Sequence, residues 1–120
     1  MRIRALSTVL MLLLASSSLA DDIVIDFEGL ADFSPVTNQF EGVEPVGVTF
    51  SSATVLTKGI SLNSFFFPPR SGTNVIFDFP TGTIGLAFTG PVTKVAGFVT
   101  GNRNVTLTAF NSSGAACAST

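Results

Sequence analysis

The chain has 120 residues, a formal net charge of −2 at pH 7, a single Cys and no His, Trp or Tyr. A nucleophilic Ser or Cys needs a neighbouring base, most often His, so a His-based catalytic triad is excluded. Nucleic-acid binding needs a basic stripe, and the basic residues beyond residue 20 stand singly along the chain. No nucleic acid is therefore expected as a partner.

The first twenty residues resemble a secretory signal peptide. Two Arg residues give a basic start, residues 5–15 form an apolar stretch, and small residues end the segment at Ala20. The apolar stretch is shorter than the roughly 20 residues that span a bilayer, so no transmembrane anchor is predicted in this chain. We expect residues 1–20 to be a cleaved signal peptide and residues 21–120 to be one exported domain, secreted or held in the cell envelope. An uncleaved N-terminal anchor is the alternative.

The composition of the mature chain favours β-structure. Cleavage removes two of the six basic residues and none of the eight acidic ones, which leaves a mature net charge of −4. Val, Ile, Thr and Phe dominate what remains, including all twelve Phe, and these residues fit a pleated, half-buried surface. Strong helix formers such as Lys, Glu, Gln and Met are scarce. The composition therefore predicts an all-β domain.

Apolar and polar residues alternate with a period of two in about seven segments, as expected for strands with one face on a core. Gly, Pro and Asn clusters separate these segments at intervals of about ten residues, the spacing of a β-sandwich or barrel. We therefore expect an antiparallel β-sandwich of jelly-roll-like type. In chain order, the predicted strands are residues 23–27, 46–50, 53–56, 75–79, 84–88, 92–99 and 105–110.

Two connections and the C-terminal end stand out from this rhythm. Residues 28–45 and 65–72 form longer loops, and a rigid scaffold with long loops usually carries its function there. The turn at residues 111–114 implies a returning strand over residues 115–120. That last strand would lack a further neighbour, so we expect the sandwich to be incomplete at its C-terminus.

Several short segments resemble exported bacterial proteins of the PEP-CTERM sorting class. Residues 25–30 (IDFEGL), 36–40 (VTNQF) and 47–51 (GVTFS) are similar to the opening of such proteins, and residues 68–75 (PPRSGTNV) and 107–114 (LTAFNSSG) to later parts. The resemblance implies a jelly-roll-like domain of largely unassigned function. The Pro-Glu-Pro signal, membrane helix and basic tail of that class do not occur in this sequence, so the resemblance implies no envelope anchor. Family members continue past the last turn, which agrees with a truncated sheet.

The acidic residues near the start of the mature chain are candidate calcium ligands, because Ca²⁺ takes six to eight oxygen ligands. Jelly-roll modules that resemble this one often hold a structural Ca²⁺ between the acidic end of the first strand and the last strand. By that resemblance, Glu28 is a candidate metal ligand. The alternative is a solvated loop carboxylate. The acidic residues in question are Asp21, Asp22, Asp26, Glu28 and Asp32.

Residues 65–67 are three consecutive Phe and form a candidate ligand platform. An exposed ring could stack on a sugar, with Phe66 and Phe67 as the contact residues. Phe lacks the polar edge with which Trp and Tyr also hydrogen-bond to a sugar. The alternative is core packing with at least one of the three exposed, because side chains in a strand alternate between its two faces.

The remaining reactive side chains do not suggest catalysis. Cys117 is the only Cys, so it is half of a disulfide completed elsewhere or a free thiol. A pair of carboxylates is enough to hydrolyse a glycoside, and Asp26, Glu28 and Asp78 are the candidates beside strands, but they form no recognisable constellation. No enzymatic activity is expected.

The sequence thus predicts a secreted, non-catalytic β-sandwich module with a structural or interaction role in the bacterial envelope or extracellular matrix. Its expected partners are extracellular polysaccharide or envelope proteins. The alternative is a carbohydrate-binding jelly-roll module that calcium stabilises.

Overall fold

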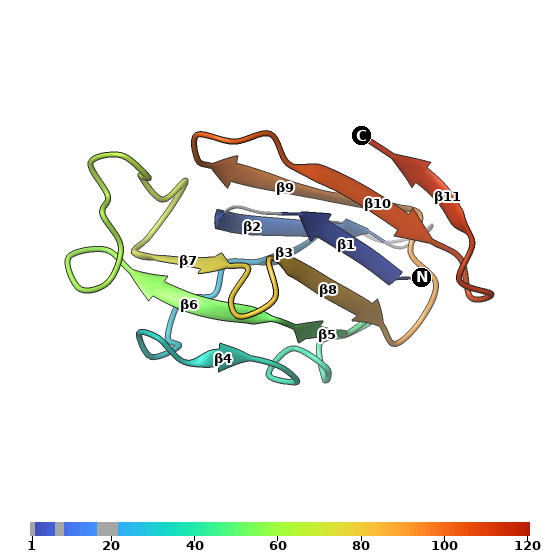
Figure 1. Ribbon diagram of the computed structural model, residues 1–120. Helices are drawn as coiled ribbons and strands as arrows, with labels where there is room; N and C mark the ends of the chain where they lie inside the picture. Colours follow the sequence, from blue (N-terminus) through green and yellow to red (C-terminus); the bar gives the residue numbers. More distant parts are fainter. Residues whose placement is uncertain (1, 7–8, 17–21) are drawn as a thin grey trace.

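A computed structural model describes residues 2–6, 9–16 and 22–120, and it consists of two antiparallel sheets that face each other (Figure 1). The first sheet has the order β11-β10-β1-β8-β5, and the second has the order β3-β2-β7-β6-β4, with β9 also paired to β2. The described residues contain no helix, so the predicted all-β antiparallel fold is confirmed. The strands are β1 (Arg2–Leu6), β2 (Val9–Ser16), β3 (Ile23–Ile25), β4 (Pro35–Val36), β5 (Val48–Ser51), β6 (Ala53–Thr57), β7 (Asn74–Phe77), β8 (Thr83–Phe88), β9 (Lys94–Thr100), β10 (Thr106–Phe110) and β11 (Ala116–Ser119).

The seven strands expected from residue alternation all occur, and five of them have one end that lies one or two residues inside the predicted bounds. Strands β3 and β7 end early, at Ile25 and Phe77, and β5, β9 and β10 begin late. Beyond β7 the chain turns, and the Gly82 N–H donates to the Asp78 carbonyl at 2.7 Å. Strand β4 lies inside a connection predicted as loop, because two residues are too few to show a period.

The main core lies between the two sheets. Its fully buried members come from both layers: Val55 and Ile76 from the second sheet, Ile84 and Leu86 from the first. Phe27 is 0% exposed and contacts the rings of Phe40 and Phe50 edge to face, at centroid distances of 5.7 and 5.6 Å. Burying one such side chain stabilises the fold by roughly 1.5–3 kcal/mol. This core fixes the positions of β3 to β8.

A second, smaller cluster covers the outer face of β6 and β7. Leu62 and Val75 are its buried members, and Leu56, Phe67 and Phe77 pack against them. Val75 and Ile76 are neighbours in β7, so they point to opposite faces, yet both are 0% exposed. Strand β7 is therefore buried on both sides. The connection between β6 and β7 supplies Leu62 and Phe67 and folds back over this outer face.

The residues predicted as signal peptide supply a central strand to each sheet. Strand β1 lies between β8 and β10, and β2 pairs with β9 on one side and with β3 and β7 on the other. In the described part of the chain, β9 joins the second sheet only through β2, and the β10–β11 pair joins β8 and β5 only through β1. The cleavage site predicted after Ala20 lies outside the described residues.

The C-terminal hairpin forms as its turn residues predict. Strand β11 returns along β10, and the Asn111 side chain organises the turn. Its Oδ1 accepts hydrogen bonds from the Ser113 N–H at 3.1 Å and from the Ala115 N–H at 3.0 Å. Gly114 has a φ of 87°, a conformation that glycine adopts at no steric cost. All four residues of β11 are exposed, so this hairpin forms an open edge of the first sheet.

Candidate functional site

The connection between β6 and β7, residues 58–73, is the most distinctive surface of the molecule. Figure 1 shows it as a pair of loops that extend beyond the ends of β6 and β7. Asp32, from the connection between β3 and β4, holds its first end: the carboxylate accepts hydrogen bonds from the Thr57 N–H at 2.7 Å and from the Ser61 hydroxyl. The Ser61 hydrogen bond is the main reason that the pKa of Asp32 lies below its usual range.

Glu28 holds the second end of the same connection. One oxygen of its carboxylate accepts the N–H groups of Thr73 at 2.9 Å and Asn74 at 2.8 Å, and the other accepts the Thr73 hydroxyl at 3.0 Å. Gly72 has a φ of 58°, and a Cβ at that position would lie 2.4 Å from the Glu28 carboxylate. Glycine is therefore required for this close approach. The carboxylates of Asp32 and Glu28, both from the connection between β3 and β4, thus hold the two ends of the connection between β6 and β7.

The predicted metal ligand Glu28 accordingly has three protein donors on its carboxylate. A metal ion would compete with these donors for the same two oxygens. Across the described residues, no group of three or more His, Cys, Asp or Glu side chains is placed to hold a metal ion. Nearby Asp26 is also engaged, since its Oδ1 accepts the Glu28 N–H at 3.1 Å. The geometry gives Glu28 the contacts of a loop clamp.

Asn74 joins these loops beneath the surface, and the sequence analysis did not identify it. Its side chain is 3% exposed, and its Nδ2 donates to the carbonyls of Phe27 and Leu30, both at 3.0 Å. Its Oδ1 accepts the Thr57 hydroxyl at 2.8 Å. A polar residue at the start of an apolar strand was the only available signal. Two of its partners, Phe27 and Leu30, lie more than forty residues away along the chain.

Within the connection, inward and outward side chains divide clearly. Leu62 and Phe67 point into the outer cluster, and the Phe67 N–H donates to the Asn63 carbonyl at 2.9 Å. Ile60, Phe65 and Phe66 point to solvent and are 74%, 86% and 67% exposed, the three highest values among the exposed large apolar side chains of the described chain. We call these three residues the apolar tip. Phe65 and Phe66 meet edge to face at 5.0 Å.

The two candidate ligand contacts therefore separate: Phe66 lies on the surface and Phe67 is half-buried beneath it. The chain turns at residues 64–66 and does not continue as a strand, so strict in-and-out alternation fails and two of the three consecutive Phe are exposed. A turn presents successive side chains on its convex side, which is how Phe65 and Phe66 come to share one surface.

The charges of the connection are all positive. Residues 58–73 contain Lys58 and Arg70 and no acidic residue. Both side chains are exposed, and the Arg70 guanidinium lies 4.8 Å from the centroid of the Phe98 ring on β9. That cation–π contact fastens the connection to a third element besides β6 and β7.

A groove lies beside the rings of Phe33 and Phe79, with a volume of about 350 Å³. Phe33 has a φ of 60°, uncommon for a non-glycine residue, and its N–H donates to the Val55 carbonyl at 2.8 Å. The ring of Phe33 lies 6.3 Å from that of Phe79, which stacks on Phe77 at 5.7 Å. Six apolar residues and three hydroxyl-bearing ones line the groove: Phe33, Pro35, Val36, Ala53, Phe79 and Pro80, with Thr37, Ser52 and Thr54.

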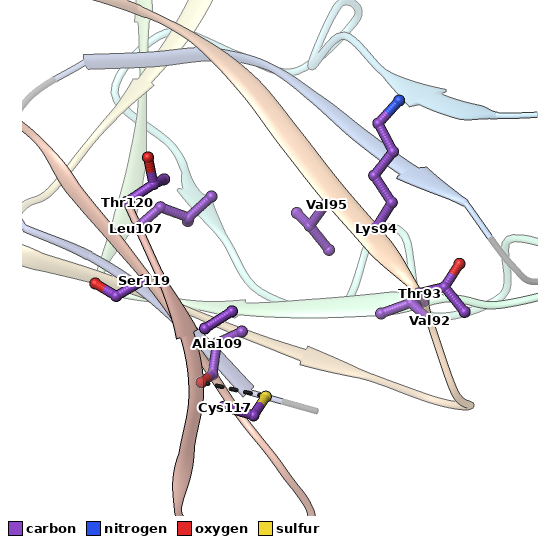
Figure 2. Close-up of a pocket in the computed structure, with 10 residues that line it drawn as sticks. Val92, Thr93, Lys94, Val95, Leu107, Ala109, Cys117, Ser119 and Thr120 are labelled. Atoms are coloured by element: carbon purple, nitrogen blue, oxygen red, sulfur yellow. Dashed lines mark hydrogen bonds between the residues drawn. The ribbon is translucent and has the colours of Figure 1, made fainter.

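A larger cleft of about 430 Å³ opens between β9 and the β10–β11 hairpin. Figure 2 shows Val95 of β9 facing Leu107 of β10 across it, with Lys94 directed away. Cys117 lines the same cleft from β11, and its thiol donates to the Ala109 carbonyl at 3.5 Å. Cys117 is a free thiol in this structure. The cleft thus lies between β9 of the second sheet and the β10–β11 end of the first sheet.

No protein-family model matches this chain, and no curated protein or solved structure is similar to it. Among the residues that the structure describes, no helix is long and apolar enough to cross a membrane. The PEP-CTERM resemblance and the jelly-roll strand order stay predictions from the sequence.

Proposed function

We propose that this protein is an exported, non-catalytic interaction module of the bacterial envelope or extracellular matrix, and that it binds its partner through the apolar tip. The observation that carries the proposal is the exposure of Ile60, Phe65 and Phe66 on one clamped connection. Large apolar side chains that gather on a surface mark a binding site, whereas scattered ones need no explanation.

The support beneath the tip suits a binding surface. Asp32 and Glu28 fix the two ends of the connection, and Leu62 and Phe67 anchor its inner side. A surface that is already ordered loses little conformational entropy when a partner binds. Rigid loops on a β-scaffold are a common arrangement for recognition. Export through the N-terminal segment would bring the tip to polysaccharides or proteins outside the cytoplasm.

A binding experiment on the full chain tests the proposal. Isolated cell envelopes and purified extracellular polysaccharide should retain the protein, and the double variant Phe65→Ser/Phe66→Ser should lose about tenfold in affinity, because two rings no longer leave water on binding. Val24→Ser is the control, since Val24 is also an exposed apolar side chain, 56% accessible, but lies on β3 and in neither of the two candidate sites. Equal retention of all three proteins would contradict the proposal.

A second candidate function is sugar binding in the groove beside Phe33 and Phe79. The observation that favours it is the combination of aromatic rings with the hydroxyls of Thr37, Ser52 and Thr54 along one groove. Sugars are recognised by ring stacking together with hydrogen bonds to their hydroxyls. In a glycan array, Phe79→Ala would then abolish binding and Phe66→Ala would leave it unchanged. The reverse result would return the sugar contact to the tip.

A further inference from the structure

We propose that the partner of the apolar tip is a membrane surface that contains anionic lipids. This inference rests on the proposed function, because it takes the tip as the contact surface and names the chemistry on the other side. A membrane contact needs apolar side chains that enter the boundary between headgroups and acyl chains, and basic side chains beside them that meet the headgroup charge. The connection at residues 58–73 carries both.

The apolar part has the shape of a protrusion. Its three most exposed side chains fall within seven residues of one another, at an end of the molecule where the connection extends past β6 and β7 (Figure 1). The groove beside Phe33, by contrast, is concave and suits a small ligand. A convex apolar surface needs a hollow in a protein partner, whereas a fluid lipid surface adapts to it.

The charge distribution points to anionic lipids. The described residues beyond β2 contain four basic side chains, and two of them, Lys58 and Arg70, lie in this one connection, which has no acidic residue. The acidic neighbours, Asp32 and Glu28, hold the two ends of the connection through hydrogen bonds with Thr57, Ser61, Thr73 and Asn74. Lys58 is exposed, and the Arg70 guanidinium keeps its charge while it lies over the Phe98 ring.

The side-chain chemistry favours lipid over sugar at this site. Phe and Ile have no polar group with which to bind sugar hydroxyls, and all three members of the tip are of these two types. The edge-to-face contact of Phe65 and Phe66 presents an edge of one ring and a face of the other. Such a pair makes a poor flat platform for a sugar ring, but it fills apolar volume well.

The test uses the full chain and vesicles of phosphatidylcholine with or without phosphatidylglycerol. The protein should sediment with the vesicles that contain phosphatidylglycerol, and Phe65→Ser/Phe66→Ser should weaken this binding about tenfold or more. Lys58→Ser, which leaves the contact of Arg70 with Phe98 in place, should weaken it several-fold, and only on the anionic vesicles. Val24→Ser, on β3, should bind as the unchanged protein does. Absence of binding to both kinds of vesicle would overturn the inference. Binding that is unchanged in Phe65→Ser/Phe66→Ser would overturn it as well.

A fluorescence measurement covers the case in which a Ser variant folds poorly. The chain contains no Trp and no Tyr, so Phe66→Trp introduces a single fluorophore at the tip. Its emission should shift to shorter wavelength on anionic vesicles and be quenched by brominated lipid, and the emission of Val24→Trp should do neither. An unchanged spectrum for Phe66→Trp would overturn the lipid inference. If polysaccharide or cell envelopes still retained the protein, and Phe65→Ser/Phe66→Ser weakened that retention, the proposed function would stand without the lipid inference.

Discussion

Two regions of the molecule, strands β5 to β8 and strands β9 to β11, are stabilised in different ways. Strands β5 to β8, together with Ile25, Phe27 and Val36, supply the buried residues of the main core. Strands β9, β10 and β11 contain no buried residue, and β11 is exposed along its whole length. The first region is held by side-chain packing. The second is held by backbone pairing with β1 and β2, and by partly buried residues such as Leu107 that rest on the core.

The N-terminal segment has a structural role in this arrangement, because its strands β1 and β2 pair with β10 and β9. Strand β2 pairs with β9 over nearly its full length, from Val9↔Thr100 to Ser16↔Lys94. Without β1, strands β8 and β10 would be separated by the width of one strand. Without β2, strand β9 would be separated in the same way from β3 and β7. Such a gap would expose unpaired N–H and C=O groups on both sides. Signal-peptide processing, which we propose on the sequence pattern, would therefore change the sheet pairing of the exported domain.

The largest effect is expected from removing residues 1–20. Residues 21–120 should melt with low cooperativity and should be poorly soluble, because β9 to β11 lose the strands with which they pair. Hydrogen exchange should show fast exchange in β9 and β10 and slower exchange in β6 to β8. A sharp cooperative melt like that of the full chain would show that the C-terminal strands have another way to join the sheets.

Single substitutions in the two regions should differ clearly. Ile76→Ala in the main core should lower the free energy of unfolding by about 3 kcal/mol, because it leaves a cavity at a fully buried site. Leu107→Ala in β10 should cost about 1 kcal/mol, since that side chain is only half-buried and its surroundings are open. Denaturant titration measures both values. Similar costs at the two sites would mean that the C-terminal region is packed as tightly as the first.

The polar contacts beneath the tip should show an intermediate effect. Asn74→Ala leaves the carbonyls of Phe27 and Leu30 without this donor, and should lower the free energy of unfolding by about 2 kcal/mol. Asn104→Ala, at an exposed position outside any strand, is the control and should have little effect. Equal unfolding curves for the two variants would remove Asn74 from the account of how the loops are held.

The smallest effect concerns pH. The pKa of Asp32 is lowered in the folded protein below 3.8, chiefly by the Ser61 hydroxyl, so the ionised carboxylate favours folding. Its contribution is present above the ordinary pKa of an aspartate and is lost as the pH falls through the folded value. The melting temperature of Asp32→Asn should therefore fall less on acidification than that of the unchanged protein. Parallel pH profiles would contradict this role.

Local patterns were enough to predict the strands, because alternation and turn residues act over a few positions. The return of β11 after Asn111, for example, followed from the turn alone. The clamp by Glu28 could not be predicted, since its partner Thr73 lies 45 residues away and no local pattern encodes that contact. The alternation over residues 75–79 did not tell which face of the strand meets the main core: Ile76 does, whereas Val75 and Phe77 belong to the outer cluster. Beyond the end of β7, the Phe79 ring is 51% exposed.

The clamp beneath the tip has one more consequence, because it binds main-chain groups. Asp32 and Glu28 accept the N–H groups of Thr57, Thr73 and Asn74, which any residue other than proline would offer. Phe65 and Phe66 lie between these points, and their N–H groups are not among those that the two carboxylates accept. A foreign sequence in place of Phe65 and Phe66 should therefore be held at the same position without loss of the fold.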